Sequence, residues 1–136
     1  MTKHISILCL FVLLAAAPAA TNPPATTVTL DDFKLVGDLS GDQAVFTLTA
    51  TARVENSKGG SLDLLSGAVA LTDAPTHPQW RIRVQQSRFV AVFDHGGKFP
   101  IKIKFNAAVR QSEPWKAVDF HVAPSVLQPI VLQGLG

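Results

Sequence analysis

Apolar and polar residues alternate with a period of two along most of the chain after residue 27. The clearest case is AVFTLTATARV at 44–54. Successive side chains of a strand point to opposite faces, so this pattern predicts an antiparallel strand with one buried face. The residues expected on the buried face are Phe46, Leu48, Ala50, Ala52 and Val54.

Similar patterns predict further strands before and after this one. Residues 28–36 alternate at Val28 and Leu30 and change phase at Asp31–Asp32, which indicates a β-bulge or a bend. RFVAVF at 88–93 is apolar on both faces, so we expect a central strand there. The other expected strands are 61–65, 67–72, 80–84, 98–109, 118–122 and 129–133.

These patterns predict one fold class. The chain carries about eight or nine short strands at roughly ten-residue spacing, separated by turn signals. No segment has a helical period of useful length, although Pro124 and Ser125 in 123–128 favour a single helical turn. We therefore expect an all-β domain over 28–136, a single antiparallel β-sandwich, with a small closed β-barrel as the alternative.

The N-terminus has the pattern of a targeting segment. Lys3 and His4 precede an apolar run at 5–17, and small residues follow at Ala17–Ala19. A run of about 13 apolar residues is too short for a permanent membrane span, so we predict a signal peptide over 1–19, with a retained anchor as the alternative. A proline-containing spacer follows at 20–27. Export to the periplasm, the cell surface or the medium is expected.

Cysteine and charge exclude several classes of function. Cys9 is the only cysteine and lies inside the predicted signal helix, so the exported domain has no thiol for a disulfide or a metal. Removing Lys3 with the signal leaves 11 of the 12 Lys and Arg against 10 Asp and Glu, a net charge of +1. Such a domain is not a strongly basic nucleic-acid binder.

The stretch FDHGGKF at 93–99 is the strongest candidate for catalytic chemistry. A catalytic or metal-binding His95 would need partners, and the histidines at 77 and 121 have no metal-ligand spacing with it. The serine elbow of hydrolases is also missing. We interpret the stretch as a hairpin turn, with positive φ at Gly96 and Gly97 and with Asp94 bonding the turn backbone. We expect no enzyme activity, no metal and no cofactor.

Two basic strand faces are the candidate binding residues. Arg81 and Arg83 alternate with apolar residues on one strand, and Lys102 and Lys104 do so on another. If the strands are neighbours, these side chains form a positive patch for an anionic polysaccharide or an envelope protein. Trp115 follows a turn and could stack on a sugar ring. A solvated face is the plainer interpretation of the charges.

Trp80 differs from Trp115 in its strand pattern. It is in phase with Ile82 and Val84 on the apolar side of the strand 80–84, so we expect it in the core.

Two long stretches resemble a known family. They are FTLTATARVENSKGGSLDLLSGAVALT at 46–72 and the run from RFVAVF to VLQGL at 88–135. Together they resemble the N-terminal β-rich module of long, cysteine-poor, signal-peptide-bearing bacterial envelope proteins of uncharacterised function. The markers are the strand before D-x-G-G, KFNAAVRQ, the Trp of EPW and the end VAPSVLQPIVLQGL. The resemblance implies export and a β fold, and it transfers no active site.

The functional expectation follows from these observations. We expect an exported, non-enzymatic structural or interaction module of the bacterial envelope, either the head of a larger protein or a module on its own. The alternative is a polysaccharide-binding module that uses Arg81, Arg83, Lys102, Lys104 and Trp115.

Overall fold

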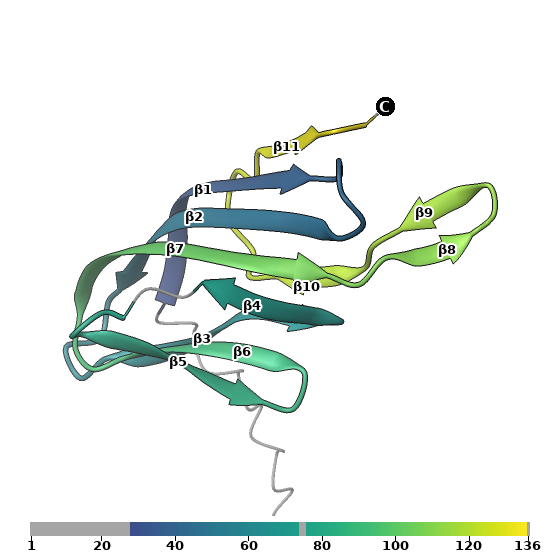
Figure 1. The fold of residues 1–136 in the computed structure, drawn as a ribbon. Coiled ribbons are helices and arrows are strands. Elements are labelled where there is room, and N and C mark those ends of the chain that lie inside the picture. Colours follow the sequence, from purple (N-terminus) through teal and green to yellow (C-terminus); the bar gives the residue numbers. More distant parts are fainter. Residues whose placement is uncertain (1–27, 74–75, 136) are drawn as a thin grey trace, which may run out of the picture.

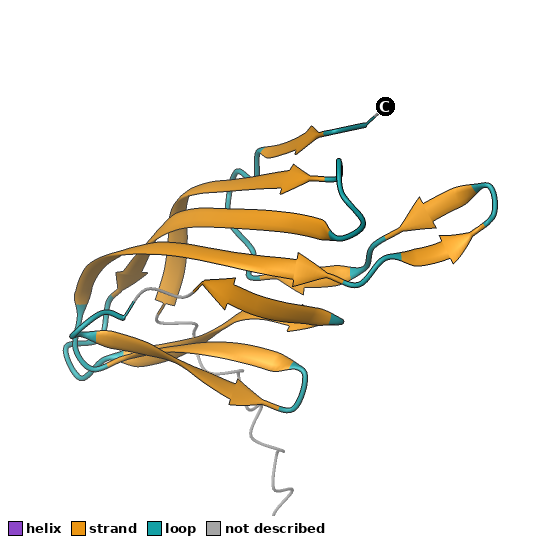
Figure 2. Cartoon of the chain, in the orientation of Figure 1, coloured by secondary structure: helices purple, strands orange, loops and turns teal. Residues whose placement is uncertain are grey.

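The computed structural model describes residues 28–73 and 76–135. The predicted signal peptide at 1–19 and the spacer at 20–27 lie outside the described residues. The described part of the chain is built of strands and loops (Figure 2). It contains no helix with the length and apolar character that a membrane span requires.

The strands form two main sheets and one separate hairpin (Figure 1). The first sheet has the order β11-β1-β2-β7-β4, the second has the order β10-β3-β6-β5, and β8 pairs with β9. The strand bounds are β1 Val28–Asp38, β2 Ala44–Val54, β3 Gly60–Gly67, β4 Val69–Asp73, β5 Trp80–Gln85, β6 Arg88–Phe93, β7 Gly97–Ala107, β8 Arg110–Ser112, β9 Trp115–Ala117, β10 Phe120–Val122 and β11 Ile130–Gln133.

A single hydrophobic core lies between the two main sheets and confirms the β-sandwich. It combines buried side chains of β1, β2 and β7 with those of β3, β5 and β6. Both sheets are open and have edge strands, so the described residues do not form a closed barrel. The predicted central position of 88–93 is also confirmed, because β6 pairs with β3 on one side and with β5 on the other.

The long strands β2 and β7 carry the predicted alternation into the core. They pair antiparallel from Ala44–Ala107 to Val54–Gly97. The inward side chains of both strands are buried, while the intervening Thr and Lys residues point away from the core. Phe46 and Phe105 stack with ring centroids 5.4 Å apart, and Phe120 of the second sheet meets both rings edge-on. Aromatic burial thus joins the two sheets at this level.

The predicted irregularity in the first strand is a β-bulge. The register between β1 and β2 shifts between Asp31 and Lys34, and Asp32 adopts a positive φ of 52°. The bulge restores the alternation, so Phe33 and Leu35 return to the core after it.

The turn at 94–96 is not the hairpin that the sequence predicted. β6 belongs to the second sheet and β7 to the first, so the turn crosses between the layers. β6 is already paired along both edges and has no free edge to offer β7, whereas β2 pairs along the whole length of β7. Of the two glycines, Gly97 has positive φ (143°). A Cβ on Gly96 would lie 2.9 Å from the Asn56 oxygen.

The predicted helical turn at 123–128 is also wrong. The backbone N–H of Ala123 donates to Leu64 in the second sheet, and the Ser125 hydroxyl donates to the Leu30 oxygen in the first. The segment is therefore stretched across the side of the sandwich. After this segment the chain enters β11, which joins the first sheet. β11 pairs parallel with β1, in contrast to the antiparallel pairing predicted for the sandwich.

Candidate functional site

The structure does not bring the five predicted binding residues together. Arg81 and Arg83 lie on β5 of the second sheet, and Lys102 and Lys104 lie on β7 of the first. These strands lie in opposite layers of the sandwich (Figure 1). Each pair alternates with core-facing residues, so the two pairs point outward from opposite layers. Trp115 is exposed (75%) on the separate hairpin β8–β9, whereas Trp80 is buried as predicted.

The separation of these residues follows from the crossing turn. A hairpin between 88–93 and 98–109 would have placed all the basic strands in one sheet. Because the chain changes layer at 94–96, β5 stays with β6 and β7 joins β2. Arg81 is further engaged by the Asp94 carboxylate, with 2.8 Å between the paired atoms.

The histidines take part in local contacts. His95 Nδ1 lies 2.8 Å from the Gly96 oxygen in the crossing turn. The ring of His77 accepts the Gln79 N–H and stacks near Trp80. Among the described residues, no side-chain hydrogen bond joins a histidine to a serine or a carboxylate, and no group of three His, Cys, Asp or Glu could hold a metal ion.

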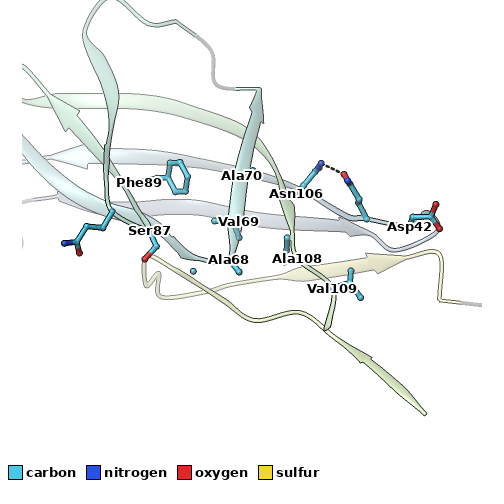
Figure 3. A pocket seen from close by; sticks show the side chains of 13 residues that line it. Asp42, Ala68, Val69, Ala70, Ser87, Phe89, Asn106, Ala108 and Val109 are labelled. Atoms are coloured by element: carbon cyan, nitrogen blue, oxygen red, sulfur yellow. Dashed lines mark hydrogen bonds between the residues drawn. The ribbon is translucent and has the colours of Figure 1, made fainter. Parts of the chain in front are cut away.

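A shallow cleft of about 630 Å³ lies beside β4 (Figure 3). Small apolar side chains such as Ala68 and Ala108 line it together with Phe89, and the lining residue Asn106 donates to the Gln43 side chain (2.6 Å). Asp42 is the one acidic side chain in the lining. A nucleophile needs an adjacent base, and this lining has no such pair.

The C-terminal segment, residues 126–135, carries six of the eight exposed large hydrophobic side chains among the described residues. The exposed large hydrophobic side chains outside it are Val84 and Trp115. Those inside it are Val126, Leu127, Ile130, Val131, Leu132 and Leu135. Apolar side chains concentrated in one short segment mark an interaction surface more strongly than the same side chains scattered singly.

The strand β11 is held on one side and open on the other. Among the described residues, it forms the edge of the first sheet and pairs only with β1. Backbone hydrogen bonds fix both of its ends, from Leu35 N–H to the Pro129 oxygen (3.0 Å) and from Leu39 N–H to the Gln133 oxygen (2.9 Å). Its outer backbone groups remain available to another strand.

A largely apolar groove of about 410 Å³ runs beside this edge. Ile130 and Leu132 of β11 form one wall, and the other is formed by β10, which includes His121, together with Val118 and Asp119. The Asp119 carboxylate is paired with Arg110. The buried side chains of Leu35 and Phe46 reach its floor. The sandwich is thus incompletely covered on this side, next to an edge strand that can accept a partner.

The edge at β11 also lacks the charges that protect the other sheet edges. Residues 120–135 contain no Lys, Arg, Asp or Glu. The edge strand β5 carries two arginines, β4 ends on Asp73, and β10 is only three residues long. Charges and short length discourage edge pairing. This site was not predicted from the sequence, although the uncharged run from residue 120 is visible there.

Comparisons with known proteins yield one distant likeness. No protein-family model and no curated protein matches the chain. The chain is similar to a mutant M1 zinc metallopeptidase from Deinococcus radiodurans, solved with a Tyr-Ser-Ala substrate, at 19% identity and a TM-score of 0.41. The likeness covers 65% of this chain and 22% of the peptidase. A TM-score of this size does not establish a shared fold.

Proposed function

We propose that this chain is an exported, non-enzymatic interaction module that binds another polypeptide by β-strand addition at β11. The observation that carries the proposal is the uncharged, apolar edge strand beside a largely apolar groove. We call the surface formed by β11 and this groove the open edge. Its partner is an extended segment with alternating apolar side chains.

Strand addition provides hydrogen-bond partners for the outer backbone groups of β11 and apolar contacts for the side chains of the groove. The incoming backbone pairs with the outer N–H and C=O groups of β11, and alternate side chains enter the groove beside Ile130 and Leu132. Main-chain pairing provides affinity and the groove provides selectivity for apolar side chains. Fully burying one such side chain contributes about 1.5–3 kcal/mol, part of which offsets the entropy that the incoming strand loses on binding.

The N-terminal sequence supports an exported location for this module. An apolar run at 5–17 follows Lys3 and precedes small residues, as in signal peptides. The domain that remains has no cysteine, and the resemblance to the head module of envelope proteins favours the periplasm or the cell surface. A neighbouring β-rich domain of such a protein would present the extended segments that the open edge accepts.

A matched pair of substitutions tests the proposal. Ile130→Lys places a charge at the open edge, and Val84→Lys places the same charge on the edge strand β5, at similar exposure (58% and 61%). Tagged full-length chains are recovered from the cell envelope and their complexes are separated by size. We expect Ile130→Lys to lose a complex that Val84→Lys retains. Equal complexes for both variants, or none for the unaltered chain, would contradict the proposal.

Export itself is tested by the mass of the recovered chain. We expect a species in the envelope or the medium that has lost about the first 19 residues, as in signal-peptide cleavage. Recovery of the intact chain from the cytoplasm alone would contradict export.

A further inference from the structure

The outer face of the first sheet places lysines from two strands around a row of threonines. The strand register sets Lys34 of β1 opposite Thr49 of β2, and Thr49 opposite Lys102 of β7. In the next row, Thr47 lies opposite Lys104. All five residues alternate with core-facing neighbours, so they point to the same side. We call this surface the lysine–threonine face.

The positive charge on this face is not neutralised by ion pairs. Four arginines of the described chain are each bound to an aspartate, the pairs being Arg53–Asp31, Arg81–Asp94, Arg88–Asp63 and Arg110–Asp119. The three lysines of the face take part in no ion pair among the described residues, although Asp73 of β4 is in register with Lys104. The lysine ammonium groups are therefore available to a ligand.

We infer that the lysine–threonine face binds a linear anionic polysaccharide, one that carries carboxylate or sulfate groups at regular intervals. Lys102 and Lys104 lie about 7 Å apart along β7, and Lys34 and Lys102 lie about 10 Å apart across two strand spacings. A linear polymer with acidic groups at regular intervals therefore contacts several of these lysines at once. The half-buried hydroxyls of Thr47 and Thr49 between the lysines exchange hydrogen bonds with sugar hydroxyls.

The composition of this face favours a polysaccharide over a membrane. Binding to an anionic lipid surface is strengthened by apolar side chains that enter the bilayer. Val131 of β11 is in register with Val36 and lies at the margin of this face. The other exposed large hydrophobic side chains of the described residues lie on β5, on the hairpin β8–β9 and at other positions of the C-terminal segment. The face has no aromatic ring either, so it offers no platform for stacking the bases of a single-stranded nucleic acid.

This site differs from the one expected from the sequence. The inferred site shares Lys102 and Lys104 with the expected one. It contains Lys34 in place of the two arginines of β5 and the tryptophan of β9. Lys34 lies on this face because it follows the β-bulge of β1. The inferred site is also independent of strand addition at the open edge, because it uses outward side chains of β1, β2 and β7 rather than the backbone of β11.

The experiment measures binding of the full-length chain to immobilised polygalacturonate and dextran sulfate, with uncharged dextran as the reference. The test variant is Lys34→Gln/Lys102→Gln/Lys104→Gln. The matched control is Lys58→Gln/Arg83→Gln/Lys116→Gln, which removes the same charge from scattered exposed positions. We expect the test variant to bind an acidic polymer about tenfold more weakly and the control to change binding less than about twofold, since exposed ion pairs contribute modestly and locally.

Three results would overturn the inference. One is equal weakening by the test and control variants, because net charge would then explain the binding. Another is equal binding to uncharged dextran. The third is binding to phosphatidylglycerol vesicles without binding to either acidic polymer, which would identify a membrane surface as the ligand. Thermal unfolding of each variant confirms that the compared chains are folded.

Discussion

Replacing Phe105 by alanine tests the layer of the core that joins the two sheets. Phe105 is fully buried, and its ring centroid lies 5.4 Å from that of Phe46 and 5.3 Å from that of Phe120. A buried Phe→Ala change costs about 3–5 kcal/mol, because the ring loses its burial and leaves a cavity. The two aromatic pairs add about 0.5–1.5 kcal/mol each beyond buried area, so we expect about 5 kcal/mol.

Urea unfolding followed by tryptophan fluorescence measures this loss. With a denaturant slope of about 1–3 kcal/mol per molar, the midpoint falls by more than about 1.5 M. Phe105→Leu serves as the graded control, because it keeps part of the buried volume and should cost about 1–2 kcal/mol. A loss below about 2 kcal/mol for Phe105→Ala would refute the reasoning, because the two sheets could not then meet at this ring.

Three further predictions concern a turn, a carboxylate and the open edge. Gly59→Ala destabilises the fold by more than about 1 kcal/mol in urea unfolding, since Gly59 has φ of 91° and a Cβ there would lie 2.0 Å from the last carbonyl oxygen of β6. Gly41→Ala, with 3.9 Å of space, is its neutral control. The Ser40 hydroxyl and backbone N–H donate to the Asp38 carboxylate and hold its pKa below the ordinary value. Ser40→Ala should therefore raise the pKa of Asp38 in an NMR titration. The two hydrogen bonds stabilise the folded protein at pH values above the ordinary pKa of aspartate, and this stabilisation disappears as the pH falls through the lower pKa that Asp38 has in the folded protein. An unchanged pKa would contradict this contact. Ile130→Lys should change the free energy of unfolding by less than about 1 kcal/mol, because the side chain is mostly exposed. A larger loss would show that Ile130 serves the fold.

The alternation of residue types was enough to predict most strands and their inward faces. In β2 and β7 the apolar positions read from the sequence are the buried ones. The bulge near Asp32 was visible as a change of phase, because inserting a residue reverses which face each side chain takes.

Strand partners could not be predicted in the same way. A glycine-containing turn after β6 suits a hairpin and a crossing between sheets equally well, and the choice depends on which edges are already paired elsewhere. The parallel pairing of β11 with β1 has the same cause, since it depends on where the segment after Ala123 is anchored.

The candidate sites illustrate the same limit. The outward direction of Lys102 was predictable from its strand alone. Its neighbour Lys34 lies 68 positions earlier in the sequence, and only the pairing of β1, β2 and β7 brings the two residues onto one face. Arg83 shows the converse case. It alternates with apolar residues much as Lys102 does, yet its strand β5 belongs to the second sheet, so the two side chains lie on different faces.

Photo-crosslinking from the open edge in living cells tests the central claim most directly. A crosslinking amino acid replaces Ile130 in one full-length chain and Val84 in another, so that the two probes start from similarly exposed positions on different edges. Strand addition at β11 predicts a discrete adduct with a second polypeptide from position 130 and none from position 84. No adduct from position 130, or the same adducts from both positions, would contradict it.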